Sequence, residues 1–313
     1  MIGETQMTTR RSVLKSIAGT GAWLAMASSQ AQQSATAGAI IKRAIPRTGE
    51  QIPVIGLGTY DAFDVGSAQT DRAALTDVLK GFVAAGGSLV DSSPMYGRAE
   101  AVVGDLTGEL GLRRSLFLAT KVWTSGRDAG IRQMEDSFRL MKTHTMDLMQ
   151  IHNLLDWKTH TATLKDWKQQ GRVRYIGITH YHEGAYDDLE RLIKTRDYDF
   201  VQLNYSIAER EAESTVLPLA QEMGVAVIAN RPFAKASLFS RVRGKEVPDW
   251  AAELDCKSWA QFFLKYIVSH PALTCAIPAT SKPKHLADNM EAAYGRLPDA
   301  KARRRMAEYV DSL

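Results

Sequence analysis

Short apolar segments alternate with longer amphipathic ones along this chain of 313 residues, and this alternation restricts its fold more than any other feature. Each apolar segment has the length and composition of a β-strand. Strands that are apolar along their whole length are buried on both faces, as in a parallel sheet covered by helices. Eight such segments begin near Val54, Ser88, Leu116, Asp147, Val173, Phe200, Val225 and Leu273.

The intervening segments repeat apolar residues with the period of an amphipathic helix. One such face contains Ala74, Leu75, Val78, Leu79 and Phe82, and another contains Ile131, Met134, Phe138 and Met141. Most strand starts lie 25 to 34 residues apart, so the chain predicts a closed (β/α)8 TIM barrel over residues 40–313. The last interval, of 48 residues, predicts an extra loop around residues 241–250.

The segment before the first strand, IIKRAIPRTGEQIPV, predicts a β-hairpin that turns at Thr48-Gly49 and plugs the bottom of the barrel. An open doubly wound sheet is the alternative fold. Its dinucleotide-binding fingerprint would require a third glycine after Gly56 and Gly58, where this chain has Asp61. The sequence therefore favours the barrel, and any dinucleotide is expected to bind in another way.

Residues 1–31 have the order of an export signal: basic residues, an apolar run from Ser16 to Ala27, and then small residues. The pair Arg10-Arg11 resembles the twin-arginine motif, which implies a periplasmic protein and a contact with the twin-arginine export machinery. We favour cleavage after Ala31, followed by a flexible lead over residues 32–39. The alternative is a disordered or amphipathic tail. The apolar run is shorter than the ~20 residues of a membrane-spanning helix, so we expect no stable membrane span.

The charge and the cysteines exclude several classes of function. The formal net charge is +4, of which residues 1–31 contribute +2, so nothing indicates a nucleic-acid partner. Cys256 and Cys275 are too few for a metal cluster or a disulfide framework, and we expect no metal site. They are expected to be buried free thiols, although a disulfide between them stays open in an oxidising compartment.

Four polar residues follow consecutive apolar segments. Asp91 and Tyr96 follow the second, Lys121 the third and His152 the fourth. Taken singly, each could be a hydrogen-bonded strand cap or a surface side chain. Because catalytic groups of such barrels lie at the carboxyl ends of the strands, the four together predict an active site there.

In these residues the chain closely resembles the aldo-keto reductase family, from about Ile40 to its end. The family's Asp, Tyr, Lys and His match Asp91, Tyr96, Lys121 and His152, GLGTY resembles its first strand, and IPATSKPKHLADN resembles its cofactor-phosphate segment. The resemblance implies an oxidoreductase that reduces an aldehyde or ketone with NADPH, NADH being possible. Tyr96 would then donate the proton, since the Lys121 ammonium would lower its pKa. Asp91 would hold Lys121, and His152 would donate a hydrogen bond to the substrate oxygen.

The same resemblance assigns residues to the cofactor and the substrate. Asn230 stands where many relatives have an aromatic residue, Thr179-His180 replaces a commoner Ser-Asn pair, and Lys282 favours NADP(H). The wall of the substrate pocket is expected to suit an aromatic or apolar small-molecule carbonyl compound, and its residues are Met95, Trp123, Asn153, Trp157 and Tyr181. The cofactor residues are Thr59, Tyr60, Thr179, His180, Gln202, Asn230, Arg231, Thr280, Ser281, Lys282, His285, Asp288 and Asn289.

Two other functions stay open from the sequence. A nucleotide-binding sensor or partner module with little turnover would keep the barrel, and Asn230 speaks for it. An aldolase-like enzyme would use Lys121 as a Schiff-base nucleophile. The presence of Tyr96 and Asp91 beside Lys121 favours the reductase over both.

Overall fold

The computed structural model describes Met1 and residues 38–313. The twin-arginine segment and the predicted cleavage site lie outside the described residues. Contacts within the chain group Ile40–Leu313 into one compact unit. Within the described part of the chain, no helix is both long enough and apolar enough to cross a membrane.

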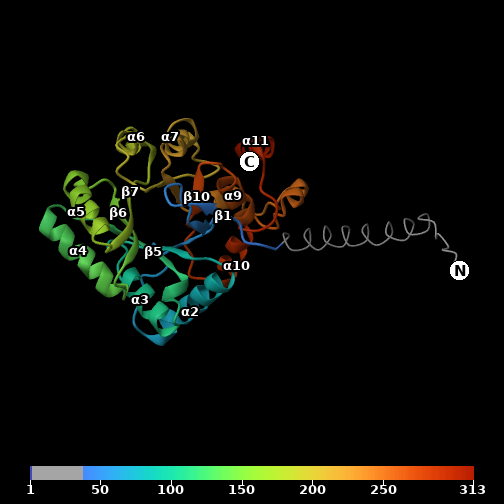
Figure 1. Ribbon diagram of the computed structural model, residues 1–313. Helices are drawn as coiled ribbons and strands as arrows, with labels where there is room; N and C mark the ends of the chain where they lie inside the picture. Colours follow the sequence, from blue (N-terminus) through green and yellow to red (C-terminus); the bar gives the residue numbers. More distant parts are fainter. Residues whose placement is uncertain (2–37) are drawn as a thin grey trace. The chain divides into compact units, whose positions relative to one another are not determined.

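The unit is a (β/α)8 barrel, which confirms the predicted fold (Figure 1). Its eight parallel strands pair in chain order, so that each strand lies beside the next one along the sequence. Helices surround the strands, as the amphipathic segments predict. The strands are β3 (Leu57–Gly58), β4 (Leu89–Asp91), β5 (Phe117–Val122), β6 (Met146–His152), β7 (Val173–Thr179), β8 (Phe200–Asn204), β9 (Ala226–Asn230) and β10 (Leu273–Ala276).

The helices follow the strands with few additions. The main helices are α2 (Gln69–Ala84), α3 (Ala99–Glu109), α4 (Arg127–Leu140), α5 (Trp157–Gln169), α6 (Tyr186–Lys194), α7 (Val216–Met223), α8 (Ser237–Arg241), α9 (Trp259–Val268), α10 (Pro283–Glu291) and α11 (Ala300–Asp311). Short 3-10 turns are η1 (Arg113–Ser115), η2 (Glu183–Ala185), η3 (Glu211–Ser214) and η4 (Asp249–Leu254). The expected extra loop between β9 and α9 contains α8 and η4.

The seam between the first and last strands closes through close approaches of the backbone. Parallel bridges join Ile55 to Ala276 and Gly58 to Ala279. A Cβ atom at Gly58 would lie 2.8 Å from the Ile277 carbonyl oxygen across this seam. One at Gly56 would lie 3.1 Å from Cys275 Sγ of β10 and 2.9 Å from the Leu89 carbonyl oxygen of β4. The two glycines that do not complete a dinucleotide fingerprint therefore serve to close the barrel.

The hairpin β1 (Lys42–Ala44) and β2 (Gln51–Pro53) is antiparallel and lies across one end of the barrel (Figure 1). Gly49 takes a positive φ of 76° in its turn, which glycine adopts at little cost. Ile45 and Ile52 are buried in one cluster with Leu89, Phe117 and Phe200 of the barrel interior. The hairpin thus closes the end of the barrel at which the strands begin.

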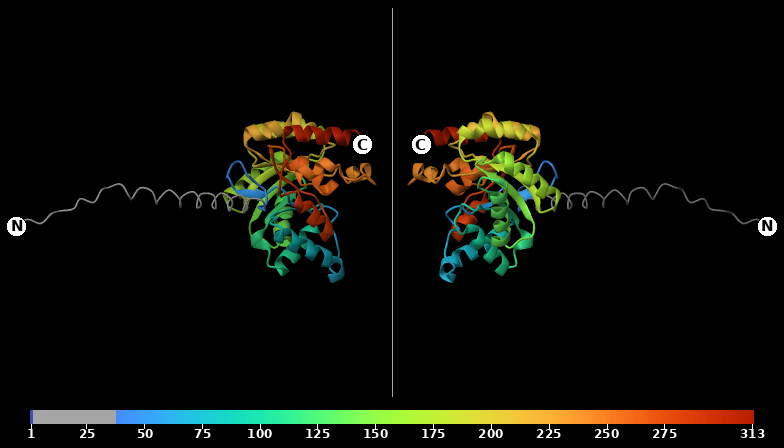
Figure 2. Two further views of the ribbon diagram at one scale, coloured as in Figure 1. Left: turned by 90° about the vertical axis from the view of Figure 1, so that its right-hand side faces the viewer. Right: turned by 90° about the vertical axis from the view of Figure 1, so that its left-hand side faces the viewer.

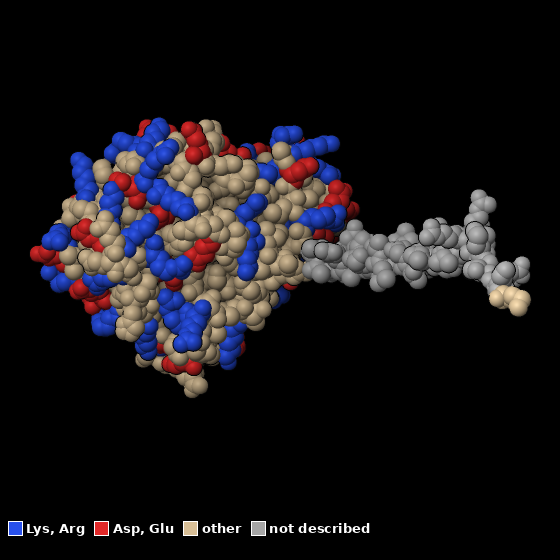
Figure 3. All heavy atoms as spheres, viewed as in Figure 1, with Lys and Arg blue, Asp and Glu red and all other residues tan. Residues whose placement is uncertain are grey.

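The outer helices are joined by ion pairs as well as by apolar contacts. Figure 2 shows α11 beside α7 along one side of the barrel. Arg210 pairs with Asp311 at 2.8 Å, and the nearly buried Arg303 pairs with Glu213 at 2.7 Å. Basic and acidic side chains are interspersed over the face seen in Figure 3.

Candidate active site

Because side chains alternate along each strand, the candidate residues point into the barrel interior. Successive inward residues of β5 are Phe117, Ala119 and Lys121, of which the first two belong to the interior cluster. On β6 the inward residues change in the same way, from Leu148 to His152. Both strands are therefore apolar where they begin and polar where they end, which collects their polar groups at one end of the barrel.

Asp91 and Lys121 form a buried ion pair at this end. Lys121 Nζ lies 2.5 Å from Asp91 Oδ2 and donates a second hydrogen bond to the Ser92 carbonyl oxygen at 2.7 Å. The side chain of Lys121 is 0% exposed. Burial alone would lower the pKa of Lys121, but the charge of Asp91 and the Tyr96 hydroxyl raise it above its usual value. The amine is therefore a cation.

Two glutamines complete the shell around Asp91. Its Oδ1 accepts hydrogen bonds from Gln150 Nε2 at 3.0 Å and from Gln202 Nε2 at 2.9 Å. Gln202 Oε1 in turn accepts from Thr179 Oγ1 at 3.2 Å and from Asn230 Nδ2 at 3.5 Å. Gln202, expected to contact the cofactor, thus also holds Asp91. The network leaves each oxygen of this buried carboxylate with a donor, as a buried charge requires.

Tyr96 lies in the loop between β4 and α3, at the mouth of the barrel. Its ring centroid is 5.0 Å from Lys121 Nζ, and its ring packs edge to face against Tyr60 at 5.1 Å and against His152 at 5.9 Å. The charge of Lys121 does act to lower the pKa of this phenol, as the sequence predicted, but burial outweighs it. Burial raises the pKa of Tyr96, and the opposing charge of Lys121 only reduces this rise. The protonated phenol is the form that can donate a proton.

His152 is buried at the end of β6 and is neutral. Burial, and then the charge of Lys121, lower its pKa to about 2. Its Nδ1 lies 2.9 Å from Ser93 Oγ. Its Nε2 has no hydrogen-bond partner among residues 38–313, which leaves this atom available to a ligand.

A cavity of about 710 Å³ opens above these groups. Ligand pockets for drug-sized molecules span about 300–1,000 Å³. Its predicted lining residues are Thr59, Tyr60, Asp91, Met95, Tyr96, His152, Asn153, Thr179, Tyr181, Gln202, Asn230, Arg231, Thr280, His285, Asp288 and Asn289. The cavity extends from the barrel interior to the start of α10, so it brings together residues that are about 200 positions apart.

The structure places six predicted residues outside the wall of this cavity: Lys121, which is fully buried beneath it, and five others. His180 stacks on Tyr181 at its rim, and Trp123 is exposed with its ring 6.2 Å from that of His152. Ser281 and the exposed Lys282 lie just before α10, beside the lining residue Thr280. Trp157 is furthest from its expected role, because its ring faces Arg191 and Lys158 at the helical surface.

Sequence reasoning missed several residues of the site. Gln150 and Ser93 were not singled out, although Gln150 lies two residues before His152 on one strand and therefore shares its inward face. The cavity is also lined by Phe233, Phe239 and Trp259, from the loop after β9 and the start of α9. The length of this loop was apparent from the sequence, but its position over the cavity depends on the tertiary fold.

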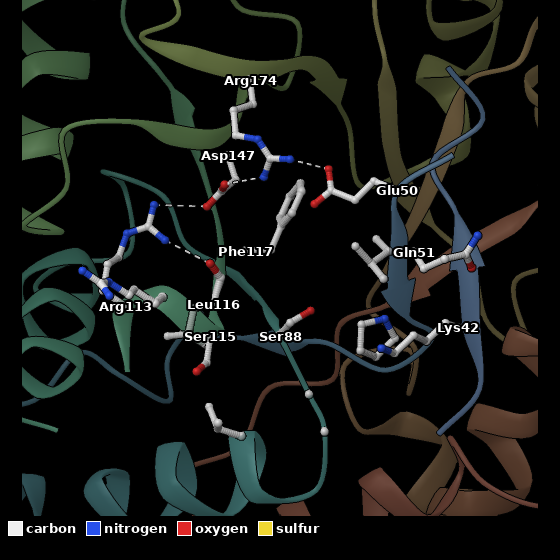
Figure 4. Close-up of a pocket in the computed structure, with 16 residues that line it drawn as sticks. Lys42, Glu50, Gln51, Ser88, Arg113, Ser115, Leu116, Phe117, Asp147 and Arg174 are labelled. Carbon is white, nitrogen blue, oxygen red and sulfur yellow. Dashed lines mark hydrogen bonds and ion pairs between the residues drawn. The ribbon is translucent and has the colours of Figure 1, made fainter. Parts of the chain in front are cut away.

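A second cavity of about 570 Å³ lies at the other end of the barrel, beside the hairpin (Figure 4). Arg174 pairs there with Glu50 and with Asp147 at 2.8 Å, and Arg113 pairs with Asp147 at 3.2 Å. Figure 4 shows that these pairs run from the hairpin across the starts of the strands. The pair of Arg174 and Glu50 joins the hairpin to the barrel, and the pairs with Asp147 join neighbouring parts of the barrel, so the charged residues of this cavity have a structural role.

Cys256 and Cys275 are both free and buried, and they belong to different apolar clusters. The disulfide that the sequence left open is not formed. Within residues 38–313, no group of three or more His, Cys, Asp or Glu side chains is arranged to hold a metal ion.

Known proteins are similar to this chain in sequence and in fold. The profile of the Aldo/keto reductase family matches residues 54–305. Methylglyoxal reductase YeaE of Escherichia coli (strain K12) is 30% identical over 247 residues, which cover 76% of this chain and 84% of the relative. An aldo-keto reductase of Klebsiella pneumoniae in complex with NADPH has a similar fold, with a TM-score of 0.71 at 24% identity over 87% of this chain and 96% of that chain.

The holo form of the aldo-keto reductase AKR11C1 of Bacillus halodurans also has this fold, with a TM-score of 0.71 at 20% identity over 87% of this chain and 96% of that chain. The match of the family profile spans the strands that carry Asp91, Lys121 and His152 and ends within α11. The chain therefore belongs to the aldo/keto reductase family.

Proposed function

We propose that this protein reduces an aldehyde or ketone to an alcohol with NADPH, and that Tyr96 donates the proton. One observation carries the proposal: a charged, fully buried Lys121 is held by Asp91 with its Nζ 5.0 Å from the ring centroid of Tyr96, under an open cavity. A cation beside a phenol favours the loss of the phenolic proton. This arrangement is suited to proton transfer, and the barrel fold does not require it.

The cavity fits an extended dinucleotide. Its inner end is lined by His152 and Thr179 and its outer end by Thr280, His285 and Asn289, where α10 begins. The free N–H groups and the dipole at the start of a helix favour a phosphate group. When bound, NADPH supplies the hydride. Lys282, exposed at the N-cap of α10, is a suitable cation for an adenosine-side phosphate.

The residues of this chain would divide the remaining chemistry among them. Tyr96 carries the proton that the developing alkoxide takes up, and the Lys121 ammonium stabilises the phenolate that remains. His152, neutral because its pKa is about 2, can donate one hydrogen bond from Nε2 to the carbonyl oxygen. Asp91 keeps Lys121 charged and fixed in place.

The substrate that suits this cavity is an apolar or aromatic carbonyl compound. Within residues 38–313, the large apolar side chains that are exposed are Tyr60, Met95, Trp123, Tyr181 and Phe239. All except Trp123 line the cavity, and Trp123 lies beside His152. Apolar side chains gathered at one opening favour an apolar ligand. An aromatic aldehyde is therefore expected to show a higher kcat/KM than methylglyoxal, the small compound in the name of the E. coli relative.

Tyr96→Phe tests the proton donor. We expect the variant to bind NADPH as the wild type does, with turnover lower by about 10²- to 10⁴-fold, the usual contribution of an acid–base group. Nucleotide fluorescence measures binding, and a single-turnover experiment measures NADPH oxidation with benzaldehyde. Equal turnover in the two proteins would exclude Tyr96 as the donor.

The same experiment decides between the reductase and its alternatives. Wild-type protein that binds NADPH and never oxidises it in the presence of carbonyl compounds would be a sensor. A Schiff-base role requires a neutral, accessible amine. Lys121 is fully buried and its pKa is raised by Asp91 and Tyr96 against the effect of burial, which speaks against that role.

We propose further that the protein is exported to the periplasm by the twin-arginine route, on the basis of Arg10-Arg11 and the apolar run that follows. This route transports folded proteins, so a cofactor bound in the cytoplasm could travel with its enzyme. Cell fractionation of the wild type and of an Arg10→Lys, Arg11→Lys variant tests export. Wild-type protein that stays in the cytoplasm would overturn this proposal.

A further inference from the structure

Ser93, in the loop after β4, is the neighbour of the His152 imidazole. Its side chain is fully buried, and its Oγ lies 2.9 Å from His152 Nδ1. The same oxygen accepts a hydrogen bond from the backbone N–H of Met95 at 3.3 Å. We propose that Ser93 is a positioning residue whose hydroxyl donates to Nδ1 of His152 and thereby places the ring proton on Nε2, the nitrogen left without a protein partner.

Counting donors and acceptors decides the direction of this hydrogen bond. A serine hydroxyl has one proton to donate and two lone pairs. If Nδ1 carried the proton, Ser93 Oγ would accept from both Nδ1 and Met95, and its own proton would need another acceptor. Among residues 38–313 no other hydrogen bond is formed by this hydroxyl, and a buried donor without a partner is costly. With the ring proton on Nε2, the Ser93 hydroxyl donates to Nδ1 and accepts from the Met95 N–H, so the hydroxyl proton and Nδ1 each have a partner.

The placement of the proton matters because the imidazole is neutral. A neutral ring has one donor nitrogen and one acceptor nitrogen, whereas a protonated ring would have two donors. Burial and the charge of Lys121 lower the pKa of His152 to about 2, so the doubly protonated form is excluded at neutral pH. Only the tautomer that Ser93 selects can donate from Nε2 to a ligand.

The ring is held in place by packing as well as by this hydrogen bond. It lies edge to face on Tyr96 at 5.9 Å and is tilted against Trp123 at 6.2 Å. These contacts restrain the plane of the imidazole without choosing which nitrogen carries the proton. Ser93 therefore determines the tautomer of His152, whereas the surrounding aromatic rings determine only the orientation of its ring.

Histidine labelled with ¹⁵N reports the tautomer directly, because a protonated and an unprotonated ring nitrogen resonate far apart. The spectrum of a His152→Gln variant assigns the signals of His152. We expect the wild type and Ser93→Thr, which keeps a hydroxyl, to carry the proton on Nε2, and Ser93→Ala to populate both tautomers. Ser92→Ala is the matched control, since the Ser92 hydroxyl contacts Thr59 and makes no hydrogen bond to His152.

The effect on turnover rests on the proposed function. Ser93→Ala should lower kcat in proportion to the fraction of His152 that carries its proton on Nδ1, about twofold at equal population, with an unchanged Kd for NADPH. Ser93→Thr should restore it. If the wild type reduces no carbonyl compound but shows the expected tautomers, the positioning role stands and the proposed function fails.

Two results would overturn the inference itself. One is a wild-type His152 whose assigned ¹⁵N signals place the proton on Nδ1. The other is a folded Ser93→Ala protein whose His152 keeps the wild-type tautomer. Thermal unfolding of each variant shows whether it is folded.

Discussion

The buried pair of Asp91 and Lys121 illustrates how much of this site depends on single residues. Lys121 donates to Asp91 and to the Ser92 carbonyl, and Asp91 accepts from Lys121, Gln150 and Gln202. Removing one partner of a buried pair leaves the other charge without compensation, whereas an apolar replacement of both does not. The two side chains should therefore be strongly coupled in the free energy of unfolding.

A double-mutant cycle measures this coupling. We expect Lys121→Met and Asp91→Leu each to lower the free energy of unfolding by about 3–5 kcal/mol. The double variant should lose clearly less than the sum of the two, because it leaves no uncompensated charge. Urea unfolding monitored by circular dichroism gives the four values, and strictly additive losses would show that the pair is not coupled.

At the scale of elements, the packing of α3 against α4 depends on the position of a glycine. Gly104 and Gly108 lie in the same helix, α3. A Cβ atom at Gly104 would overlap the Leu140 carbonyl oxygen at the end of α4, whereas one at Gly108 would meet only the flexible end of Lys142, at 3.7 Å. Gly104 therefore permits the close contact between α3 and α4, whereas Gly108 takes no part in it.

Alanine at these two positions should have opposite effects. Gly104→Ala is expected to lower the free energy of unfolding by about 1–3 kcal/mol or more, because backbone atoms would have to move. Gly108→Ala should raise it by up to about 1 kcal/mol, the gain in helix propensity at an exposed site. Thermal unfolding of both variants checks this. A Gly104→Ala protein as stable as Gly108→Ala would contradict the packing explanation.

At the scale of the whole molecule, partly buried histidines make the native state sensitive to acid. Burial, and then Arg303, lower the pKa of His270 to about 4, and burial lowers that of His180 to about 4 as well. As the pH falls, each of these histidines becomes protonated near pH 6.5 in the unfolded chain but only near pH 4 in the native state. Their contribution to stability is therefore full above pH 6.5 and declines as the pH falls. Glu100 and Glu209, whose pKa values burial raises, act in the opposite direction.

Comparison of variants separates these opposing contributions. His270→Asn keeps an acceptor for the Ala272 N–H and removes the titrating group. Between pH 6.5 and 4.5, we expect the free energy of unfolding of the wild type to fall by up to about 1.4 kcal/mol per pH unit more than that of the variant. Urea unfolding across this range checks it. His144 is exposed, so His144→Asn serves as the control for replacing a histidine away from this site.

The sequence by itself determined the barrel, the positions of its strands and the residues at their ends. Hydrophobic periodicity is a local signal, and each strand carries its own. The predicted strands from Leu116, Asp147, Val173 and Phe200 begin within one residue of β5, β6, β7 and β8. The inward position of Lys121 and His152 follows from the same alternation.

Only the tertiary structure decided how these residues affect one another. The direction of the Tyr96 pKa depends on a balance between burial and the charge of Lys121, which lies on another strand. The contact of Gln202 with Asp91 joins residues that are 111 positions apart. The position of Trp157 at the helical surface and the role of Gly56 at the seam also depend on contacts between distant parts of the chain. A short stretch of sequence cannot report burial and contacts that distant parts of the chain create.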